Sequence, residues 1–335
     1  MGNKFFSKVQ WGKETTRGTA VAADTIELGQ SFAINPDRKP TYPVEQFGVR
    51  AESLRTVVHQ YLVMNTLKSD HAYFQQLPIT FGCGVKGGVT ATETTPAQSD
   101  YLWAFTPSLT AANAPDAITI EMGDDVQAWE AEYCMFERIR IGGSVSQGMD
   151  ASPVTLERDF FGRQLTATTF TGAISLPTVE PMNAKLARFY VDTAWAGVGG
   201  TEKTATLRGF DIEILTGLHP IFSGSAAKFF DTYAEGLIGV TATFTLEGNA
   251  AANAIFTAMQ AQTFQAVRLK ILGPQIGTGT THSLSIDIGG TWESVIPMNG
   301  EDRSDNLTQA VFRGFYDATG AKLLAVNVTT NTSAY

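Results

Sequence analysis

The sequence is poor in charged residues, cysteine and histidine. Only 17% of its 335 residues are charged and 43% are hydrophobic, so the chain can bury a large core and is not expected to be disordered. The two cysteines, Cys83 and Cys134, are too few for a disulfide framework and match no zinc spacing, which predicts two buried thiols in strands. The four histidines lie outside any HxxxH or HExxH frame, which disfavours a metal site.

Basic residues and long apolar runs are also scarce. Lys and Arg number 24 against 33 Asp and Glu, and the net charge of −9 lacks the basic patch of a nucleic-acid-binding protein. No stretch approaches the roughly 20 apolar residues that a membrane span needs. The first ten residues lack the apolar core of a secretion signal. We therefore expect a soluble protein, made in a cytoplasm, that enters no membrane.

Motifs for catalysis are missing as well. There is no G-x-S-x-G elbow and no P-loop. The run Asp287-Ile-Gly-Gly-Thr291 resembles the phosphate loop of sugar kinases, but too little chain follows it to build that domain, so we predict a β-turn. The acidic pairs at 124–125 and 301–302 are predicted to be solvated loops. We predict no catalytic, cofactor-binding or metal-binding residue, and no enzyme.

What the sequence does contain is alternation of apolar and polar residues, which is typical of half-buried antiparallel strands. It is clearest at 118–122, 210–214, 242–247, 267–271 and 284–288. An alanine-rich run at 250–262, which Asn249 can cap, predicts a helix. A shorter helix is predicted from Ser69 to Gln76, ending at Pro78, with a strand after it at 79–85. The fold class is therefore mainly β, a sandwich or barrel, with one short helix in each of two units.

The order strand, long loop, strand, helix, strand, strand occurs twice and suggests an internal duplication. In the first half these segments are 26–34, 35–53, 56–64, 69–76, 79–85 and 117–123; in the second half they are 205–215, 216–236, 240–247, 250–262, 264–272 and 283–289. A Trp-Glu pair lies near the last strand of each set, at 129–130 and 292–293. Chance similarity of two ordinary β domains is the alternative.

This pattern gives a division of the chain into five segments. We expect an N-terminal arm at 1–25, a first β domain at 26–178, a linker at 179–204, a second β domain at 205–320 and a C-terminal tail at 321–335. The glycine-rich stretch at 197–200 marks the linker, and the polar run at 327–333 marks the tail or an edge strand.

The segment from Trp11 to Val21 contains Glu14-Thr-Thr-Arg-Gly-Thr-Ala20, which resembles the opening of siphophage tail tube proteins. The resemblance implies a structural virion protein, assembled in the host cytoplasm, whose sheets join side by side around a channel and whose rings stack into a tube. It implies a tape-measure protein and tail-tip and terminator proteins as partners, and DNA that passes without specific contact. With the apparent duplication it favours trimeric rings of pseudo-sixfold symmetry over hexamers.

The same resemblance suggests which residues carry the assembly. The two long loops would mediate contacts between rings, with the candidates Pro36, Arg38, Pro40, Tyr42, Phe47, Leu218, Pro220, Phe222, Phe229 and Phe230. Hydrophilic strand faces would line an acidic channel that repels DNA, with the candidates Asp211, Glu213, Thr243, Thr245 and Glu247. The alternatives are a capsid decoration or receptor-binding β protein, and a β-rich carbohydrate-active enzyme, which would need two carboxylates in an aromatic cleft.

Overall fold

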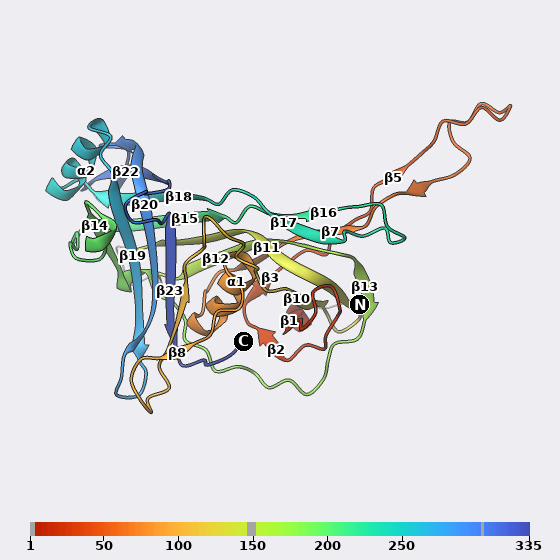
Figure 1. Ribbon diagram of the computed structural model, residues 1–335, viewed down its shortest axis with the longest axis horizontal. Coiled ribbons are helices and arrows are strands. Elements are labelled where there is room, and N and C mark those ends of the chain that lie inside the picture. The colour runs from red at the N-terminus through yellow and green to blue at the C-terminus, as the bar shows by residue number, and fades with distance from the viewer. Residues whose placement is uncertain (1–3, 146–151, 303–304) are drawn as a thin grey trace.

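The computed structural model describes residues 4–145, 152–302 and 305–335. The protein is mainly β, as the sequence predicts, and its strand ladders are antiparallel (Figure 1). The strands of the first half are β1 (Lys8–Lys13), β2 (Thr25–Glu27), β3 (Gln30–Ser31), β4 (Pro36–Asp37), β5 (Pro40–Thr41), β6 (Val57–Val58), β7 (Leu62–Ser69), β8 (Thr92–Glu93), β9 (Tyr101–Phe105), β10 (Ile118–Gly123), β11 (Ala128–Ser144), β12 (Val154–Gly162) and β13 (Leu165–Thr168). Those of the second half are β14 (Ala187–Asp192), β15 (Leu207–Leu215), β16 (Leu218–Ile221), β17 (Thr232–Glu235), β18 (Gly239–Glu247), β19 (Gln265–Gln275), β20 (Thr281–Ile296), β21 (Glu301–Asp302), β22 (Asp305–Gly314) and β23 (Leu324–Thr330). The helices are α1 (Leu77–Gly84) and α2 (Ala250–Gln260), with short 3₁₀ turns at Lys4–Phe6, Phe74–Gln76, Ala184–Leu186 and Trp195–Gly197.

One pairing pattern occurs in both halves and defines two units. In the first unit, the N-terminal part of β11 lies between β10 and β13, and its C-terminal part joins β12, which continues to β7. In the second unit, the N-terminal part of β20 lies between β19 and β23, and its C-terminal part joins β22, which continues to β18 and β15. β10 pairs with β1 in the first unit, as β19 pairs with β14 in the second. Strand β9 adds to the outer side of β23.

The two long strands also change sheet at equivalent positions. The register of β11 against β12 shifts between Phe136 and Arg138, and that of β20 against β22 shifts between Trp292 and Ser294. Each shift is a β-bulge, which bends a strand and lets it leave one sheet for another. Helix α1 packs on β11 and α2 packs on β20. The structural counterpart of Trp292-Glu293 is thus Phe136-Glu137, and the predicted match with 129–130 is wrong.

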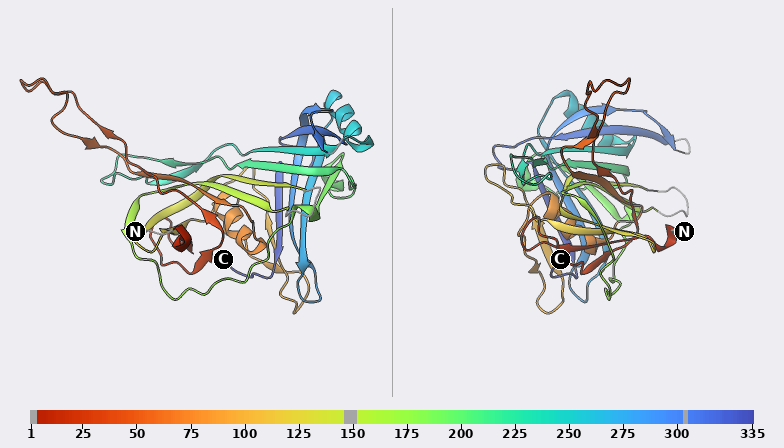
Figure 2. Two further views of the ribbon diagram at one scale, coloured as in Figure 1. Left: turned by 180° about the vertical axis from the view of Figure 1, so that it is seen from behind. Right: turned by 90° about the vertical axis from the view of Figure 1, so that its right-hand side faces the viewer.

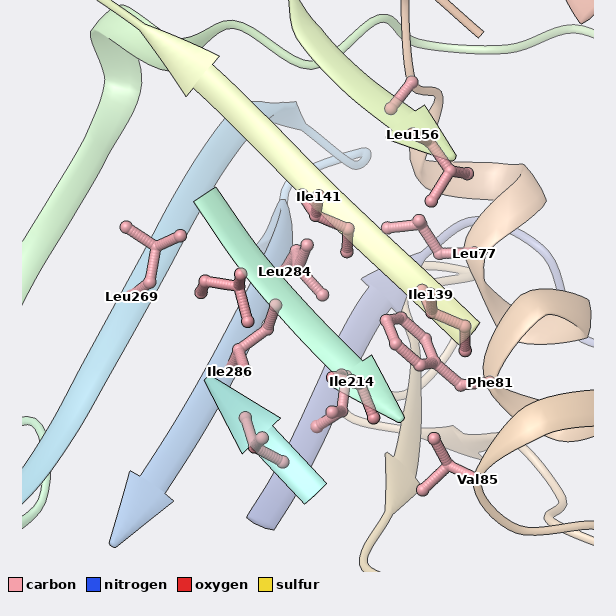
Figure 3. Packing of buried hydrophobic residues seen from close by; sticks show 14 of the residues in the cluster. Leu77, Phe81, Val85, Ile139, Ile141, Leu156, Ile214, Leu269, Leu284 and Ile286 are labelled. Atoms are coloured by element: carbon pink, nitrogen blue, oxygen red, sulfur yellow. The ribbon is translucent and has the colours of Figure 1, made fainter. Parts of the chain in front are cut away.

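A continuous core connects both units. Figure 3 shows Leu77 and Phe81 of α1, Ile139 and Ile141 of β11 and Leu284 and Ile286 of β20 facing one interior. The alternating segments predicted from the sequence are strands, and each buries its apolar face. Figure 1 shows β19, β20 and β23 running across the direction of β15 and β18, so the core lies between crossed sheets.

The helix predictions were right for α2 and wrong for α1. Asn249 caps α2, since its side chain accepts hydrogen bonds from the backbone of Ala251 and Ala252. The first helix does not end at Pro78 but begins at Leu77 and has Pro78 in its first turn, where the missing N–H of proline costs nothing. All eight residues of α1 are buried, so the apolar run at 79–85 that suggested a strand belongs to a buried helix, and Cys83 lies in it.

Three further segments differ from the expectation. Asp287 to Gly290 form the middle of β20, not a turn, because Asp287 pairs with Arg268 and close neighbours leave no space for side chains at the two glycines. The expected linker contributes β14, whose six residues pair with β19. The expected tail contributes β23, which pairs with β20 on one side and β9 on the other.

Candidate assembly surfaces

The two units are joined by a sheet junction between β11 and β15. Seven residue pairs, from Arg138 opposite Leu215 to Ser144 opposite Gly209, form this antiparallel ladder. On the core side Ile139 and Ile214 face the interior and are buried. The ladder makes a single sheet of β7, β12, β11, β15, β18, β22 and the C-terminal part of β20.

Charged residues cross the junction on the other side of the sheet. The Arg138 guanidinium lies among three carboxylates, with Nε 2.5 Å from Asp159 Oδ2, one Nη 3.2 Å from Glu213 Oε2 and a contact to Glu157. Hydrogen bonding to Asp159, assisted by the other carboxylates, holds the pKa of Arg138 above its usual value, so it stays charged. Two carboxylates belong to β12 and one to β15, so a single arginine fastens three strands together.

The predicted lumen residues share this face. Asp211 and Glu213 of β15 lie beside the polar residues of β18, and all five candidates point away from the core: Asp211, Glu213, Thr243, Thr245 and Glu247. Arginines on the face are matched by acids: Arg208 Nε lies 2.6 Å from Glu247 Oε2. The arginines of this face are therefore paired with acids, while Lys68 of β7 is an exposed cation on the same face.

The joined sheet has an open edge at each end. Within the part of the chain that the structure describes, Thr291 to Ile296 of β20 pair only with β22. At the other end, residues 30–37 lie along β7 in one register, with ladder pairs at both ends of the segment. Matching the two units by register makes Phe32 the counterpart of Phe210 and Ile34 that of Ile212. Residues 30–37 thus correspond to β15, the strand that completes the internal junction.

The first long loop is a projecting hairpin, which we call the first arm (residues 38–61; Figure 2). Its base is held by Arg38, whose guanidinium lies 4.6 Å from the centre of the Tyr61 ring. Beyond the base the arm exposes apolar side chains: Tyr42 is 60%, Val44 72%, Phe47 36%, Val49 65% and Leu54 65% exposed. The candidates Pro36 and Pro40 are exposed as well. Such a surface on a thin hairpin is typical of a contact site.

The second long loop, which we call the second arm (residues 216–238), is folded onto its own chain. Leu218 and Phe230 are buried in a cluster with Ala117, Tyr133, Met135 and Phe161 of the first unit. These two candidates therefore anchor the arm internally and offer no side chain to another subunit. Phe222, Phe229 and Pro220 are half-buried.

Arg163 holds the second arm in place. Its guanidinium donates to the carbonyls of Phe230 and Asp231, each at 3.0 Å, and to that of Gly18 at 3.0 Å. It also lies over the rings of Tyr133 and Phe230. The sequence contains no signal for this role, because an isolated arginine after a strand is ordinary.

The N-terminal motif, residues 14–20, binds the chain segment after β1 to the first unit. The buried Glu14 carboxylate accepts hydrogen bonds from the backbone N–H groups of Gly18 and Tyr133, each at 2.6 Å, and from the Thr119 hydroxyl at 3.0 Å. Burial raises the pKa of Glu14, and these bonds oppose the rise. Arg17 donates to the Pro115 carbonyl at 2.9 Å. The motif thus fixes the chain after β1 against β10, β11 and the loop before β10.

Sites for other chemistry are not evident in the described residues. Residues 4–145, 152–302 and 305–335 contain no group of three metal-ligating side chains, and none of their helices has the length and apolarity to cross a bilayer. Both cysteines are buried and unpaired. A cleft of about 710 Å³ beside the second arm contains Glu235, but its carboxylate already accepts the N–H groups of Asn113 and Ala114.

Comparison with known proteins leaves the family open. No protein-family model matches this chain, and no curated protein matches it.

Proposed function

We propose that the protein is a structural subunit that assembles with copies of itself through the edges of its long sheet. The observation that carries this proposal is the β11–β15 junction, at which the first unit already accepts the leading strand of the second. The C-terminal part of β20 corresponds to the C-terminal part of β11, and residues 30–37 correspond to β15. A second copy can therefore repeat the internal junction between chains, since an unpaired edge is a template for another strand.

The internal register specifies the contact between copies. Opposite Arg140 of β11 lies Glu213 of β15, and their counterparts are Ile296 and Asn35. Ile296 of one copy thus faces Asn35 of the next. Because the contact joins two different edges, it is head-to-tail, and such contacts close into rings when the rotation between copies allows. Three copies would present six equivalent units, and six copies would give the hexameric alternative.

A ring of this kind would suit a tail tube subunit of a long-tailed bacteriophage, and the N-terminal segment is similar to the opening of such subunits. The joined sheet would surround a channel with its charged face, and paired arginines would let DNA slide past without the counterion release that binding requires. The partners would then be further copies of this chain, a tape-measure protein inside the channel and the tail-tip and terminator proteins at its ends. The protein would belong to the virion.

Electron microscopy of the purified protein tests this proposal. We expect rings or stacked tubes at high protein concentration. The matched control is Ile296→Asp, which places a carboxylate at the contact where the counterpart positions Ala33 and Asn35 carry no positive charge. This variant should remain monomeric. Spikes or single particles from the unchanged protein would contradict the proposal, if the Ile296→Asp variant gives the same particles at the same concentrations.

A further inference from the structure

The two arms are equivalent parts of the two units. In the first arm Pro40 pairs with Val58, and in the second arm Leu218 pairs with Glu235. Each pair is separated by the same number of residues from the last pair of the ladder that precedes its arm. That last pair is Asp37 with Leu62 in the first unit and Leu215 with Gly239 in the second. Figures 1 and 2 show the arms leaving the body in the same direction. The two arms are therefore expected to find equivalent places to pack.

The second arm reaches its place by crossing the internal junction. It leaves the sheet between β15 and β18, in the second unit, and packs on β11, β12 and Ala117, which precedes β10, in the first unit. Leu218 and Phe230 are buried there, and the Arg163 guanidinium covers the contact. The second arm thus starts beside the strand at the edge of its own unit and packs on the neighbouring unit, which is joined to that edge.

The base of the first arm is bonded to the second arm, since the Tyr61 N–H donates to the Lys228 carbonyl at 2.8 Å. Beyond this base, no unit among the described residues of its own chain lies where the first arm could pack in the same way. The arm starts at the open edge formed by residues 30–37, and Figure 1 shows it projecting from the side of the molecule opposite α2 and β22. Its apolar residues are accordingly exposed, with Val44 and Leu54 at 72% and 65%. When the arms are aligned on their equivalent residues Pro40 and Leu218, Val44 corresponds to Phe222 of the second arm. Phe222 packs against the buried cluster.

The equivalent place on the second unit has a partly exposed aromatic side. Thr291 and Arg313 are there the counterparts of Met135 and Phe161, and Trp195 of the same chain lies against Gly289. Register matching makes Phe264 the counterpart of Ala117, and Phe315 the counterpart of Arg163. The Phe264 and Phe315 rings contact each other edge to face, with centroids 5.8 Å apart. Phe315 is 43% exposed and its neighbour Tyr316 is 50% exposed. We call Phe264, Phe315 and Tyr316 the aromatic patch.

We infer that the first arm docks on the aromatic patch of the adjacent copy in the same ring. The inference rests on the proposed edge-to-edge assembly and extends it, because it assigns the arm a lateral partner within a ring, where the sequence suggested contacts between rings. The occupant is a second copy of this chain, since the second arm shows the same contact inside one chain. The arm's apolar residues and the patch would cover each other when the ring closes.

Photo-crosslinking locates the arm directly. The probe is p-benzoylphenylalanine in place of Tyr42 or, separately, Leu54, in assemblies mixed with isotope-labelled copies. We expect crosslinks from the arm to labelled peptides that contain Phe264 or residues 315–316. The same probe in place of Leu237, which is 94% exposed on the second arm, is the positional control and should not reach those peptides.

Trypsin gives a second readout, since Arg50 and Arg55 lie in the first arm. Cleavage at these residues should be about tenfold slower in assemblies than in monomers. The double substitution Phe315→Ala and Tyr316→Ala should restore fast cleavage while thiol crosslinking between positions 35 and 296 still forms. If that edge crosslink forms but the arm maps to other surfaces, including other rings, the inference is wrong and the proposed function stands. If no edge crosslink forms, both are wrong.

Discussion

Arg140 and Asp211 belong to different halves of the chain, and their side chains meet across the β11–β15 junction, with Nε 2.8 Å from Oδ1. Their counterparts at the open edges are Ile296 and Ala33, neither of which carries a charge. The internal junction is therefore permanent and reinforced by an ion pair, whereas the contact between copies would depend on backbone pairing and apolar packing.

Grafting the ion pair onto the open edges should strengthen association. The change is Ala33→Asp combined with Ile296→Arg, which recreates the pair between copies. Each single variant should associate more weakly than the unchanged protein, because it buries an unpaired charge, and the double variant should recover or exceed the original affinity. Sedimentation velocity over a concentration series measures this. Additive weakening in the double variant would contradict the proposed register.

Removing Arg138 should destabilise the junction itself. Arg138→Ala leaves Glu157, Asp159 and Glu213 close together without a cation, so we expect a loss of about 1–3 kcal/mol in the free energy of unfolding, measured by urea denaturation. Lys68→Ala, an exposed position on the same face, should change stability by less than about 0.5 kcal/mol. Equal effects of the two substitutions would show that the cluster has no structural role.

Removing Arg163 should loosen the second arm without unfolding the sheets. Arg163→Ala deletes three hydrogen bonds to backbone carbonyls and the cover over Phe230. Hydrogen exchange in residues 216–238 should become faster, while exchange in β18 and β22 should not change. Arg188→Ala is the control, since Arg188 is an exposed arginine with only a long ion pair. Unaltered exchange in the arm would show that the apolar contacts alone hold it.

Glu14→Ala should destabilise the fold by about 1–3 kcal/mol, because buried donors of Gly18, Tyr133 and Thr119 lose their acceptor. Burial raises the pKa of Glu14 above 4.5, so the folded state binds the proton more tightly than the unfolded state does. The stability linked to this group is complete below pH 4.5 and falls as the pH rises through the folded pKa.

The difference in unfolding free energy between the unchanged protein and Glu14→Ala should consequently be larger at pH 4 than at pH 8. Thr15→Ala, at an exposed neighbouring position, controls for the substitution itself. A difference that grows with pH would show that the hydrogen bonds to the Glu14 carboxylate outweigh the cost of burying its charge.

Local patterns in the sequence predict the strands and α2 well, because alternation and the Asn249 cap are signals contained in a few neighbouring residues. They fail where distant contacts decide. Pro78 can end one helix or begin another, and only the burial of α1 on β11 decides between them. Gly289 and Gly290 suggest a turn until Trp195 and the backbone of Arg313 are found beside them.

The polar sheet face could be predicted from the sequence, but the ion pairs on it and the positions of the two arms could not. Asp211 and Glu213 share a polar sheet face, as alternation requires, yet Arg138, the partner of Glu213, lies 75 residues away from it in the sequence. Phe230 has the same apolar character as Phe47, and the sequence cannot distinguish the buried arm from the exposed one. The open edges follow from strand order, which emerges only when the whole sheet is assembled.

Disulfide or short bis-maleimide crosslinking of Asn35→Cys/Ile296→Cys tests the contact between the two open edges most directly. The native thiols of Cys83 and Cys134 should not interfere, because both are buried away from the reagent and burial raises their pKa. We expect a ladder of covalent oligomers that stops at one closed ring. We expect no oligomers from the control Thr66→Cys/Ile296→Cys, because position 66 lies on β7, inside the sheet and not at its edge. Only monomers from the first pair at high concentration, with both introduced thiols shown to be reactive, would contradict the proposed contact.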